Sequence, residues 1–296
     1  MFADQIDPPR RMGDDGTGSK PFLEEIQGLK RDFRIGLSDV WRRVHVSVRY
    51  PGTDPDPLVS GDSMRGLVIF DVDGTLSLTS EVDDDCWREA AREVLGVTSM
   101  STDWSTYSHS TDEAIATDLI RSGTVMGEEG TLVRKVRDSF AARIRMALDR
   151  DPALFQPVPG SPEIFNAISE AGWSPAIATG GWRLTAEMKL AAAKVPFTGI
   201  PAAHADDAHP REVIISTAAR RAMNDDRAAC PIVYVGDGIW DVKAAGRLGI
   251  GFIGLGRGAD AERLRAAGAG IVLSDFRDVG AFLAEVDARS RPPGAD

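Results

Sequence analysis

Short apolar runs alternate with helical segments along the chain from residue 65 onward. The first run, LVIF at residues 67–70, is continuous, which is typical of a parallel strand that helices cover on both faces. Similar runs predict further strands at residues 174–179, 231–236, 251–256 and 270–276. Because helical segments fill the intervals, the pattern predicts an α/β fold built on a doubly wound parallel sheet.

The alternation breaks in one region, where helical segments at residues 83–96, 111–123 and 131–150 follow one another without a strand. An inserted all-helical domain explains this break. The core then resumes with a helix for which Ser161 is the expected N-cap and Pro162 the first helical residue. We therefore expect a core at residues 64–79 and 156–288, a helical cap at residues 80–155 and a tail at residues 289–296.

Residues 1–63 differ in composition from the rest of the chain. Two stretches of this segment are rich in Pro, Gly, Asp and Ser, which is typical of linkers and disorder. Between them, apolar residues from Phe22 to Val44 recur at helical spacing, interrupted by two glycines. We expect a largely disordered N-terminal extension with one candidate amphipathic helix. That helix could bind a partner, could pack on the core, or could have no selected role.

The composition narrows the class of protein. The chain has 296 residues, 43% of them hydrophobic, and a formal net charge of −11, which argues against nucleic acid or an anionic membrane as a partner. Its two cysteines, Cys86 and Cys230, lie far apart outside any metal-ligand spacing, so a disulfide framework is not expected. No signal-peptide pattern and no apolar run of ~20 residues is seen, and we expect a cytoplasmic protein.

Small and acidic residues follow three of the predicted strands. They are Asp71 and Asp73 after the first strand, Thr179, Gly180 and Gly181 after the second, and Asp237 and Asp241 after the third. Open α/β sheets bind ligands at the carboxyl ends of their strands, so these groups should converge on one cleft. The Thr179 hydroxyl and the glycine N–H groups behind it suit an anion. Four carboxylates in one cleft would repel one another unless a divalent cation lay among them, and oxygen-only ligands favour Mg²⁺.

The spacing of Asp71 and Asp73 predicts that the two carboxylates have different chemical roles. With phosphate held by the metal, the Asp71 carboxylate can attack phosphorus and form an aspartyl-phosphate. Asp73, two residues further on, can protonate the leaving alcohol and then activate water. We expect Gly74 to allow the sharp turn that brings both carboxylates together, and the Thr75 hydroxyl to bond to the loop.

At these residues the chain resembles the haloacid dehalogenase-like phosphatases. The family's first motif, an apolar strand followed by Asp-x-Asp-Gly-Thr, matches residues 71–75; its second, a Thr or Ser ending a strand, matches Thr179; its fourth, Gly-Asp-x-x-x-Asp, matches residues 236–241. The resemblance covers about residues 65–285 and implies a Rossmann-like core with a helical cap of the first (C1) type, as in phosphoglycolate phosphatase-like members. It also implies Asp71 as nucleophile, Asp73 as acid/base, and Mg²⁺ bound by Asp71, the Asp73 carbonyl and Asp237, with Asp241 in support.

The third motif of the family is absent in its usual form. It is normally a lysine at the start of the helix that precedes the fourth motif, and the corresponding stretch, ADDAHPREVIISTAARRA, contains no lysine. Arg211 lies close to the expected place, and a guanidinium can bind phosphate with two hydrogen bonds. Lys189, after the second motif, is the other candidate. We favour Arg211.

Two functions of different classes remain open. One is a Mg²⁺-dependent phosphatase acting on a small phosphorylated metabolite. The other, prompted by the missing lysine and by the unusual N-terminal segment, is a non-catalytic phosphate-binding or regulatory protein with the same fold. A loop in the cap offers polar and aromatic side chains that could contact the substrate, although core packing and helix capping explain them equally well. These side chains are Trp104, Tyr107, His109, Thr111 and Asp112.

Overall fold

The computed structural model describes residues 64–123, 125–223 and 230–290. The predicted extension at residues 1–63 lies outside the described residues, as do residues 291–296 of the predicted tail. Within the described part, the last helix ends at Arg289. None of the helices in this part of the chain is long and apolar enough to span a bilayer.

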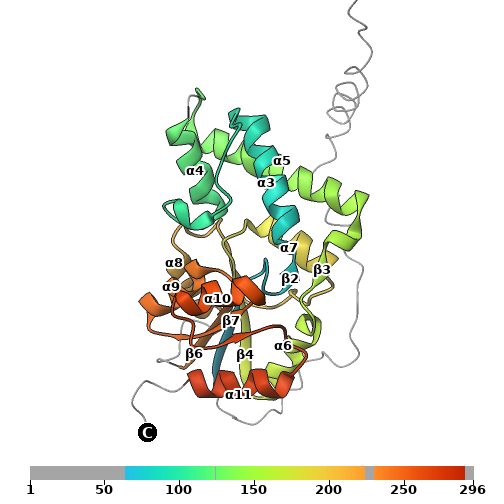
Figure 1. Ribbon diagram of the computed structural model, residues 1–296, viewed down its shortest axis with the longest axis vertical. Helices are drawn as coiled ribbons and strands as arrows, with labels where there is room; N and C mark the ends of the chain where they lie inside the picture. Colours follow the sequence, from blue (N-terminus) through green and yellow to red (C-terminus); the bar gives the residue numbers. More distant parts are fainter. Residues whose placement is uncertain (1–63, 124, 224–229, 291–296) are drawn as a thin grey trace, which may run out of the picture. The chain divides into compact units, whose positions relative to one another are not determined.

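The centre of the fold is a parallel sheet of six strands in the order β5-β4-β1-β6-β7-β8 (Figure 1). This arrangement confirms the predicted doubly wound α/β fold. The strands are β1 (Gly66–Phe70), β4 (Trp173–Ala178), β5 (Ala202–Ala203), β6 (Ile232–Gly236), β7 (Gly251–Leu255) and β8 (Val272–Leu273). The short edge strand β5 was not predicted, because two alanines carry no periodic signal, and β8 is shorter than the predicted residues 270–276.

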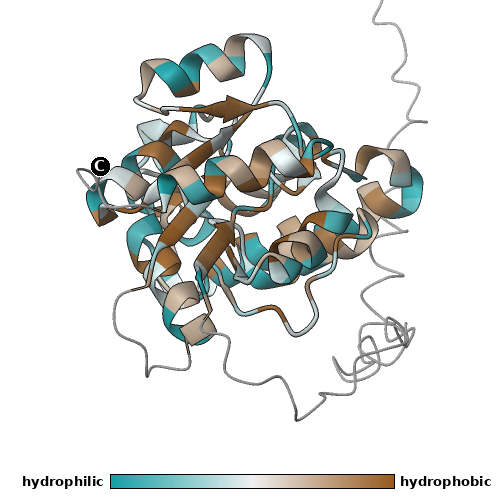
Figure 2. Ribbon diagram, turned by 90° about the horizontal axis from the view of Figure 1, so that it is seen from below, coloured by the Kyte–Doolittle hydropathy of each residue, from teal (hydrophilic) through white to brown (hydrophobic). Residues whose placement is uncertain are grey.

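Both faces of the sheet are covered, as the continuous apolar run of β1 predicts. Val68 and Phe70 point into a core shared with α6 (Ser161–Glu170), α7 (Arg183–Ala192) and α11 (Val279–Arg289). Leu67 and Ile69 point to the opposite face, where α8 (Arg211–Met223) and α9 (Ile239–Leu248) pack. Figure 2 shows the apolar strands lying between helices that carry their polar residues outward. Helix α10 (Gly258–Ala266) lies between β7 and β8 in the chain.

Three helices follow β1 without an intervening strand of the main sheet, as predicted. They are α3 (Ser80–Leu95), α4 (Asp112–Ser122) and α5 (Glu129–Arg150), which we call the cap helices. Figure 1 shows them together beyond one end of the sheet. Two turns of 3₁₀ helix (Trp104–Thr106 and Pro152–Leu154) lie among them, and a two-residue pairing of β2 (Ser77–Leu78) with β3 (Gln156–Pro157) connects them to the sheet. Whether the cap helices form a separate domain stays a prediction.

The cap helices share an apolar core that reaches the loop before α7. Trp87 of α3 and Trp182 lie parallel, with ring centroids 6.0 Å apart, and Phe140 of α5 packs against both. All three aromatic side chains are buried. The contact between Trp87 and Trp182 therefore joins the cap helices to the segment that follows β4.

The predicted start of α6 is wrong by one residue. The N-cap is Gly160, with a φ of 86°, and not Ser161. A Cβ at Gly160 would lie 2.6 Å from the backbone of Phe276, so only glycine is accommodated there. The Ser161 hydroxyl instead donates a hydrogen bond to the Leu76 carbonyl at 2.7 Å, which ties the start of α6 to the segment between β1 and β2.

Candidate active site

The strand order places the predicted site residues side by side. Strand β1 lies between β4 and β6, and Phe70 at its end pairs with Ile177 on one side and Val235 on the other. The next positions along these strands lead to Asp71, Thr179 and Asp237. This is the point where the strand order reverses, and ligands of doubly wound sheets bind there.

Asp71 is buried, with 4% of its surface exposed, and is paired with a cation. Its backbone N–H donates to the Val235 carbonyl at 2.9 Å, which fixes the residue to the neighbouring strand. Arg211 Nη1 donates to Asp71 Oδ1 at 3.1 Å, and Arg211 Nε lies 3.4 Å from Asp241 Oδ1. Arg211 is the first residue of α8, so the helix that precedes the fourth motif delivers its guanidinium to the predicted nucleophile.

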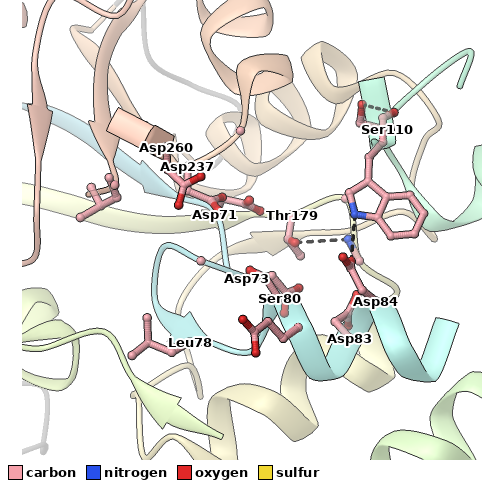
Figure 3. A pocket seen from close by; sticks show the side chains of 18 of the residues that line it. Asp71, Asp73, Leu78, Ser80, Asp83, Asp84, Ser110, Thr179, Asp237 and Asp260 are labelled. Carbon is pink, nitrogen blue, oxygen red and sulfur yellow. Dashed lines mark hydrogen bonds between the residues drawn. The ribbon is translucent and has the colours of Figure 1, made fainter. Parts of the chain in front are cut away.

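Asp237 and Asp241 complete an acidic cluster with Asp71, in which one carboxylate oxygen of each lies within 4.8 Å of the others. Asp241 is fully buried, and its oxygens accept from the Tyr234 hydroxyl at 3.1 Å and the Gly238 N–H at 3.0 Å. No donor among the described residues hydrogen-bonds to Asp237. Figure 3 shows the Asp71 and Asp237 side chains next to each other in the pocket.

The electrostatics of this cluster suit a bound cation. Burial raises the pKa of Asp71, and Arg211 opposes the rise. Burial and the neighbouring Asp71 and Asp241 raise the pKa of Asp237 well above its usual range, and burial raises that of Asp241 to about 7 despite Arg211. One guanidinium therefore does not offset the two buried carboxylates of Asp71 and Asp241 together with the half-buried carboxylate of Asp237. A divalent cation with oxygen ligands would, and the Asp237 carboxylate, which accepts no hydrogen bond from the described residues, is available to bind it.

The turn after Asp71 depends on Gly74, as predicted. Its φ is +72°, its N–H donates to the Ser77 carbonyl at 2.8 Å, and a Cβ there would overlap the Asp237 carboxylate. The expectation for Thr75 is wrong: its hydroxyl oxygen is buried and has no hydrogen-bond partner among the described residues. The close approach of the turn to Asp237 is the reason that the loop accepts only glycine at this position.

Asp73 is held from two sides. Lys189 Nζ donates to Asp73 Oδ2 at 2.6 Å and to Asp83 Oδ1 at 2.6 Å, and the Thr79 hydroxyl donates to Asp73 Oδ1 at 2.6 Å. Lys189 thus reaches the predicted acid/base, whereas Arg211 reaches the predicted nucleophile. The structure brings both candidate cations to the site, each on a different carboxylate.

The loop after β4 lies between the Arg211–Asp71 pair and the Lys189–Asp73 pair. Gly181 N–H donates to Thr179 Oγ1 at 3.2 Å, and a Cβ at Gly180 would lie 2.9 Å from Arg211 Nη2. A Cβ at Gly181 would lie 3.9 Å from Asp73 Oδ2, so the loop passes close to the predicted acid/base. Thr179, Gly180 and Gly181 all line the cavity over the cluster.

The start of α4 is attached to this loop. The Asp112 N–H donates to the Gly180 carbonyl at 2.8 Å, and the Asp112 carboxylate accepts from Trp182 N–H and from Trp87 Nε1, each at 2.8 Å. Burial raises the pKa of Asp112 to about 6, and Lys189 opposes the rise. Of the two explanations left open for Asp112, these contacts favour a structural connection between cap helices and core.

A cavity of about 1110 Å³ opens over the cluster, with lining residues from the strand ends and from the cap helices. Asp71, Asp73, Arg211 and Asp237 line it, and Trp104 and Asp84 contribute from the cap side, where Trp104 Nε1 donates to Asp84 Oδ1 at 3.1 Å. Figure 3 shows Asp84 on α3 among the side chains that line the pocket. A cavity of this size accommodates a small metabolite.

Sequence reasoning missed three residues of the site, namely Thr79, Asp83 and Tyr234. Asp83 stands in a run of three aspartates, where the sequence does not show which one points inward. The burial of Lys189 was easier to predict from the sequence, because Lys189 lies on the same helix face as the buried Thr185, Ala186 and Leu190. A lysine on an apolar face predicts a buried partner for its charge.

The fold and site have counterparts among known proteins. The family model described as haloacid dehalogenase-like hydrolase matches residues 66–249. A hydrolase from Pseudomonas syringae is 22% identical, with a TM-score of 0.55, over 74% of this chain and 98% of that one. CbbY from Rhodobacter sphaeroides in complex with phosphate is 21% identical, with a TM-score of 0.56, over 76% and 100%.

A phosphonoacetaldehyde hydrolase-like protein from Oleispira antarctica is 17% identical, with a TM-score of 0.56, over 77% of this chain and 94% of that one. These structures support the fold. A search of curated protein sequences found no match. The family match spans more than half of the chain and contains all three motifs, from Asp71 to Asp241. The chain therefore belongs to the haloacid dehalogenase-like hydrolases.

Proposed function

We propose that this protein is a Mg²⁺-dependent phosphatase that hydrolyses a small phosphorylated metabolite through an aspartyl-phosphate. The observation that carries the proposal is the position of Asp71, which lies at the switch point of the sheet between the Asp237 carboxylate and the Arg211 guanidinium. All three line the same cavity. A carboxylate nucleophile, a metal-binding carboxylate and a fixed cation are the groups that phosphoryl transfer to an aspartate requires.

In the first half-reaction, an Asp71 oxygen forms a bond to phosphorus while the bond from phosphorus to the ester oxygen breaks. The electron pair of that bond stays on the leaving oxygen, which takes the proton of the Asp73 carboxyl group and departs as an alcohol. Arg211 holds the attacking carboxylate and stabilises charge on the phosphoryl oxygens. The Thr179 hydroxyl and the N–H groups after it offer further donors at the same strand edge.

In the second half-reaction, the ionised Asp73 removes a proton from a water molecule. The water oxygen attacks phosphorus, the bond to Asp71 breaks, and its electrons return to the Asp71 carboxylate. Inorganic phosphate leaves and Asp73 is protonated again. The sum is one ester and one water converted to one alcohol and one phosphate, with both aspartates restored.

Asp71, Asp237 and the backbone carbonyl of Asp73 would hold Mg²⁺, and Asp241 would support it. The excess of negative charge in the cluster supports this set, as does the lack, within the described part of the chain, of a donor to Asp237. When bound, the ion would neutralise the phosphate and allow it to approach the Asp71 carboxylate.

The solved neighbours support a phosphorylated substrate. CbbY from Rhodobacter sphaeroides has been crystallised with phosphate and, as a variant, with xylulose-(1,5)bisphosphate. The alternative of a non-catalytic phosphate-binding protein rested on the missing lysine and on the unusual N-terminal segment, which lies outside the described residues. The contact of Arg211 with Asp71 weakens that alternative, because a cation stands where the lysine is expected.

The test is a screen of the purified full-length chain against a panel of phosphorylated sugars, polyols, amino acids and hydroxy acids, with phosphate release measured in Mg²⁺ and in EDTA. We expect release from at least one compound that requires Mg²⁺. The matched control is Asp71→Asn, which keeps the shape of the side chain and removes the nucleophile. Absence of release from every compound, or equal release by Asp71→Asn, would overturn the proposal.

A further inference from the structure

Lys189 is a buried cation that the reaction outlined above does not use. It stands on α7, ten residues after Thr179, and 1% of its side chain is exposed. Its ammonium is bound by Asp73 and Asp83, each at 2.6 Å. Asp73, Asp83 and Arg211 line the cavity, but Lys189 does not. The ammonium therefore lies behind the acid/base carboxylate and out of reach of a phosphate in the cavity.

The contacts fix both oxygens of Asp73. Lys189 Nζ binds Oδ2, and the Thr79 hydroxyl binds Oδ1 at 2.6 Å. The Thr79 hydroxyl is itself 2.8 Å from the Ser77 hydroxyl, and both of these residues are fully buried. The carboxylate is thus held in one orientation by a charge on one side and a neutral donor on the other.

Two carboxylates compensate the buried charge of Lys189. Asp73 and Asp83 each lie 2.6 Å from its ammonium. Asp83 lies in the first turn of α3, so it anchors the ammonium from the cap side. With Asp83 on one side and Asp73 on the other, the ammonium connects the first cap helix to the acid/base.

We propose that Lys189 is a positioning residue for Asp73, which it holds, together with Thr79, in the orientation that delivers a proton to the leaving oxygen. This inference rests on the proposed phosphatase function. It assigns the two buried cations to different tasks, because Arg211 acts on the nucleophile and the phosphate, whereas Lys189 acts on the leaving group through Asp73. Lys189 is then not a substitute for the family's third-motif lysine.

The two roles predict different dependences on the leaving group. A general acid matters most when the leaving alkoxide or phenoxide is a strong base, and little when it is a weak base. A phosphate-binding cation matters equally for both, because the phosphoryl group is the same. The ratio of kcat/KM for two esters of similar shape therefore separates the roles, since kcat/KM reports the steps up to departure of the leaving group.

The experiment compares p-nitrophenyl phosphate with phenyl phosphate, whose leaving group is the more basic of the two. For Lys189→Met we expect kcat/KM to fall by about 10² on phenyl phosphate and by less than about tenfold on p-nitrophenyl phosphate. The matched control, Arg211→Ala, should lower both by the same factor. Inhibition by inorganic phosphate should weaken in Arg211→Ala and stay within a few-fold of wild type in Lys189→Met. Lys189→Arg, which keeps the charge, should recover part of the loss on phenyl phosphate.

Two further variants keep the test decisive if Lys189→Met does not fold. Lys189→Met combined with Asp83→Asn removes one positive and one negative charge together. Thr79→Val removes the other donor to Asp73 without changing any charge. Both should show the selective loss on phenyl phosphate. Equal losses on the two esters, or no loss on either, would overturn the positioning role, whereas a wild-type protein inactive on every phosphate ester would overturn the proposed function itself.

Discussion

Replacement of Arg211 by alanine tests the electrostatics of the nucleophile most directly. Arg211 Nη1 lies 3.1 Å from Asp71 Oδ1, and Arg211 Nε lies 3.4 Å from Asp241 Oδ1, with both carboxylates buried. Asp73 and Lys189 form a separate pair. The variant therefore removes the cation that contacts the predicted nucleophile and leaves the contacts of the predicted acid/base intact.

The size of the effect follows from the geometry. At 3.1 Å and an effective dielectric constant of ~20, a pair of opposite unit charges attracts by about 5 kcal/mol. Part of this attraction is already present in the free enzyme. It therefore does not change the free-energy difference between free enzyme and transition state, which kcat/KM reports. The part that remains is the stabilisation of a doubly charged phosphoryl group as it approaches Asp71, and loss of one preorganised donor to such a group typically costs about 3 kcal/mol. We therefore expect kcat/KM to fall by about 10² or more.

The assay is steady-state phosphate release on the best substrate of the panel at saturating Mg²⁺, with circular dichroism to confirm folding. Arg211→Lys is the matched variant, since it keeps the charge but loses the fork that spans Asp71 and Asp241. We expect it to retain more activity than Arg211→Ala. A folded Arg211→Ala protein with kcat/KM within a few-fold of wild type would refute the reasoning and would place the phosphate-binding cation elsewhere.

Three further predictions concern the nucleophile, the metal and a buried histidine. Asp71→Asn should abolish turnover without loss of folding, and appreciable turnover would contradict the covalent mechanism. Asp237→Asn should raise the Mg²⁺ concentration needed for half-maximal activity by more than the roughly 10–100-fold typical of losing an outer-shell partner; an unchanged Mg²⁺ titration would exclude Asp237 as a ligand. Burial lowers the pKa of His204 from 6.5 to about 4, so the unfolded chain binds the proton first as the pH falls. The difference in free energy of unfolding between wild type and His204→Gln should change by up to about 3 kcal/mol against the wild type between pH ~6.5 and ~4, because the buried aspartates titrate alike in both proteins; urea titrations that give the same difference at both pH values would show that His204 makes no such contribution.

Local pattern was sufficient to predict most of the fold. The strand β1 is short, apolar at every position and covered on both faces, so its sequence alone indicates a central parallel strand. The same reasoning put Asp71, Thr179 and Asp237 at one edge, because strands that carry such residues at their carboxyl ends share that edge. Edge strand β5 and the paired β2 and β3 were missed, since two-residue strands are stabilised by their neighbours and have no period of their own.

The details of the site depended on contacts between distant segments. Nothing near Ser161 in the sequence indicates that its hydroxyl bonds to Leu76, or that Gly160 lies against the backbone at Phe276. The sequence also left Arg211 and Lys189 as rivals for one role. The choice required knowing that α8 directs Arg211 to Asp71, while α7 directs Lys189 to Asp73 from behind the cavity wall.

Two separate cations suit the opposite requirements that the proposed mechanism places on the two aspartates. Asp71 must stay ionised to attack phosphorus, and a guanidinium with a pKa above the usual value for arginine cannot surrender a proton to it. Asp73 must instead lose and regain a proton in each cycle. The Lys189 ammonium contacts one oxygen of Asp73 and one oxygen of Asp83. It therefore holds the Asp73 carboxylate in place, while part of its positive charge compensates Asp83. A single cation could not contact Asp71 at the cavity wall and also hold Asp73 from behind that wall, as Arg211 and Lys189 do separately.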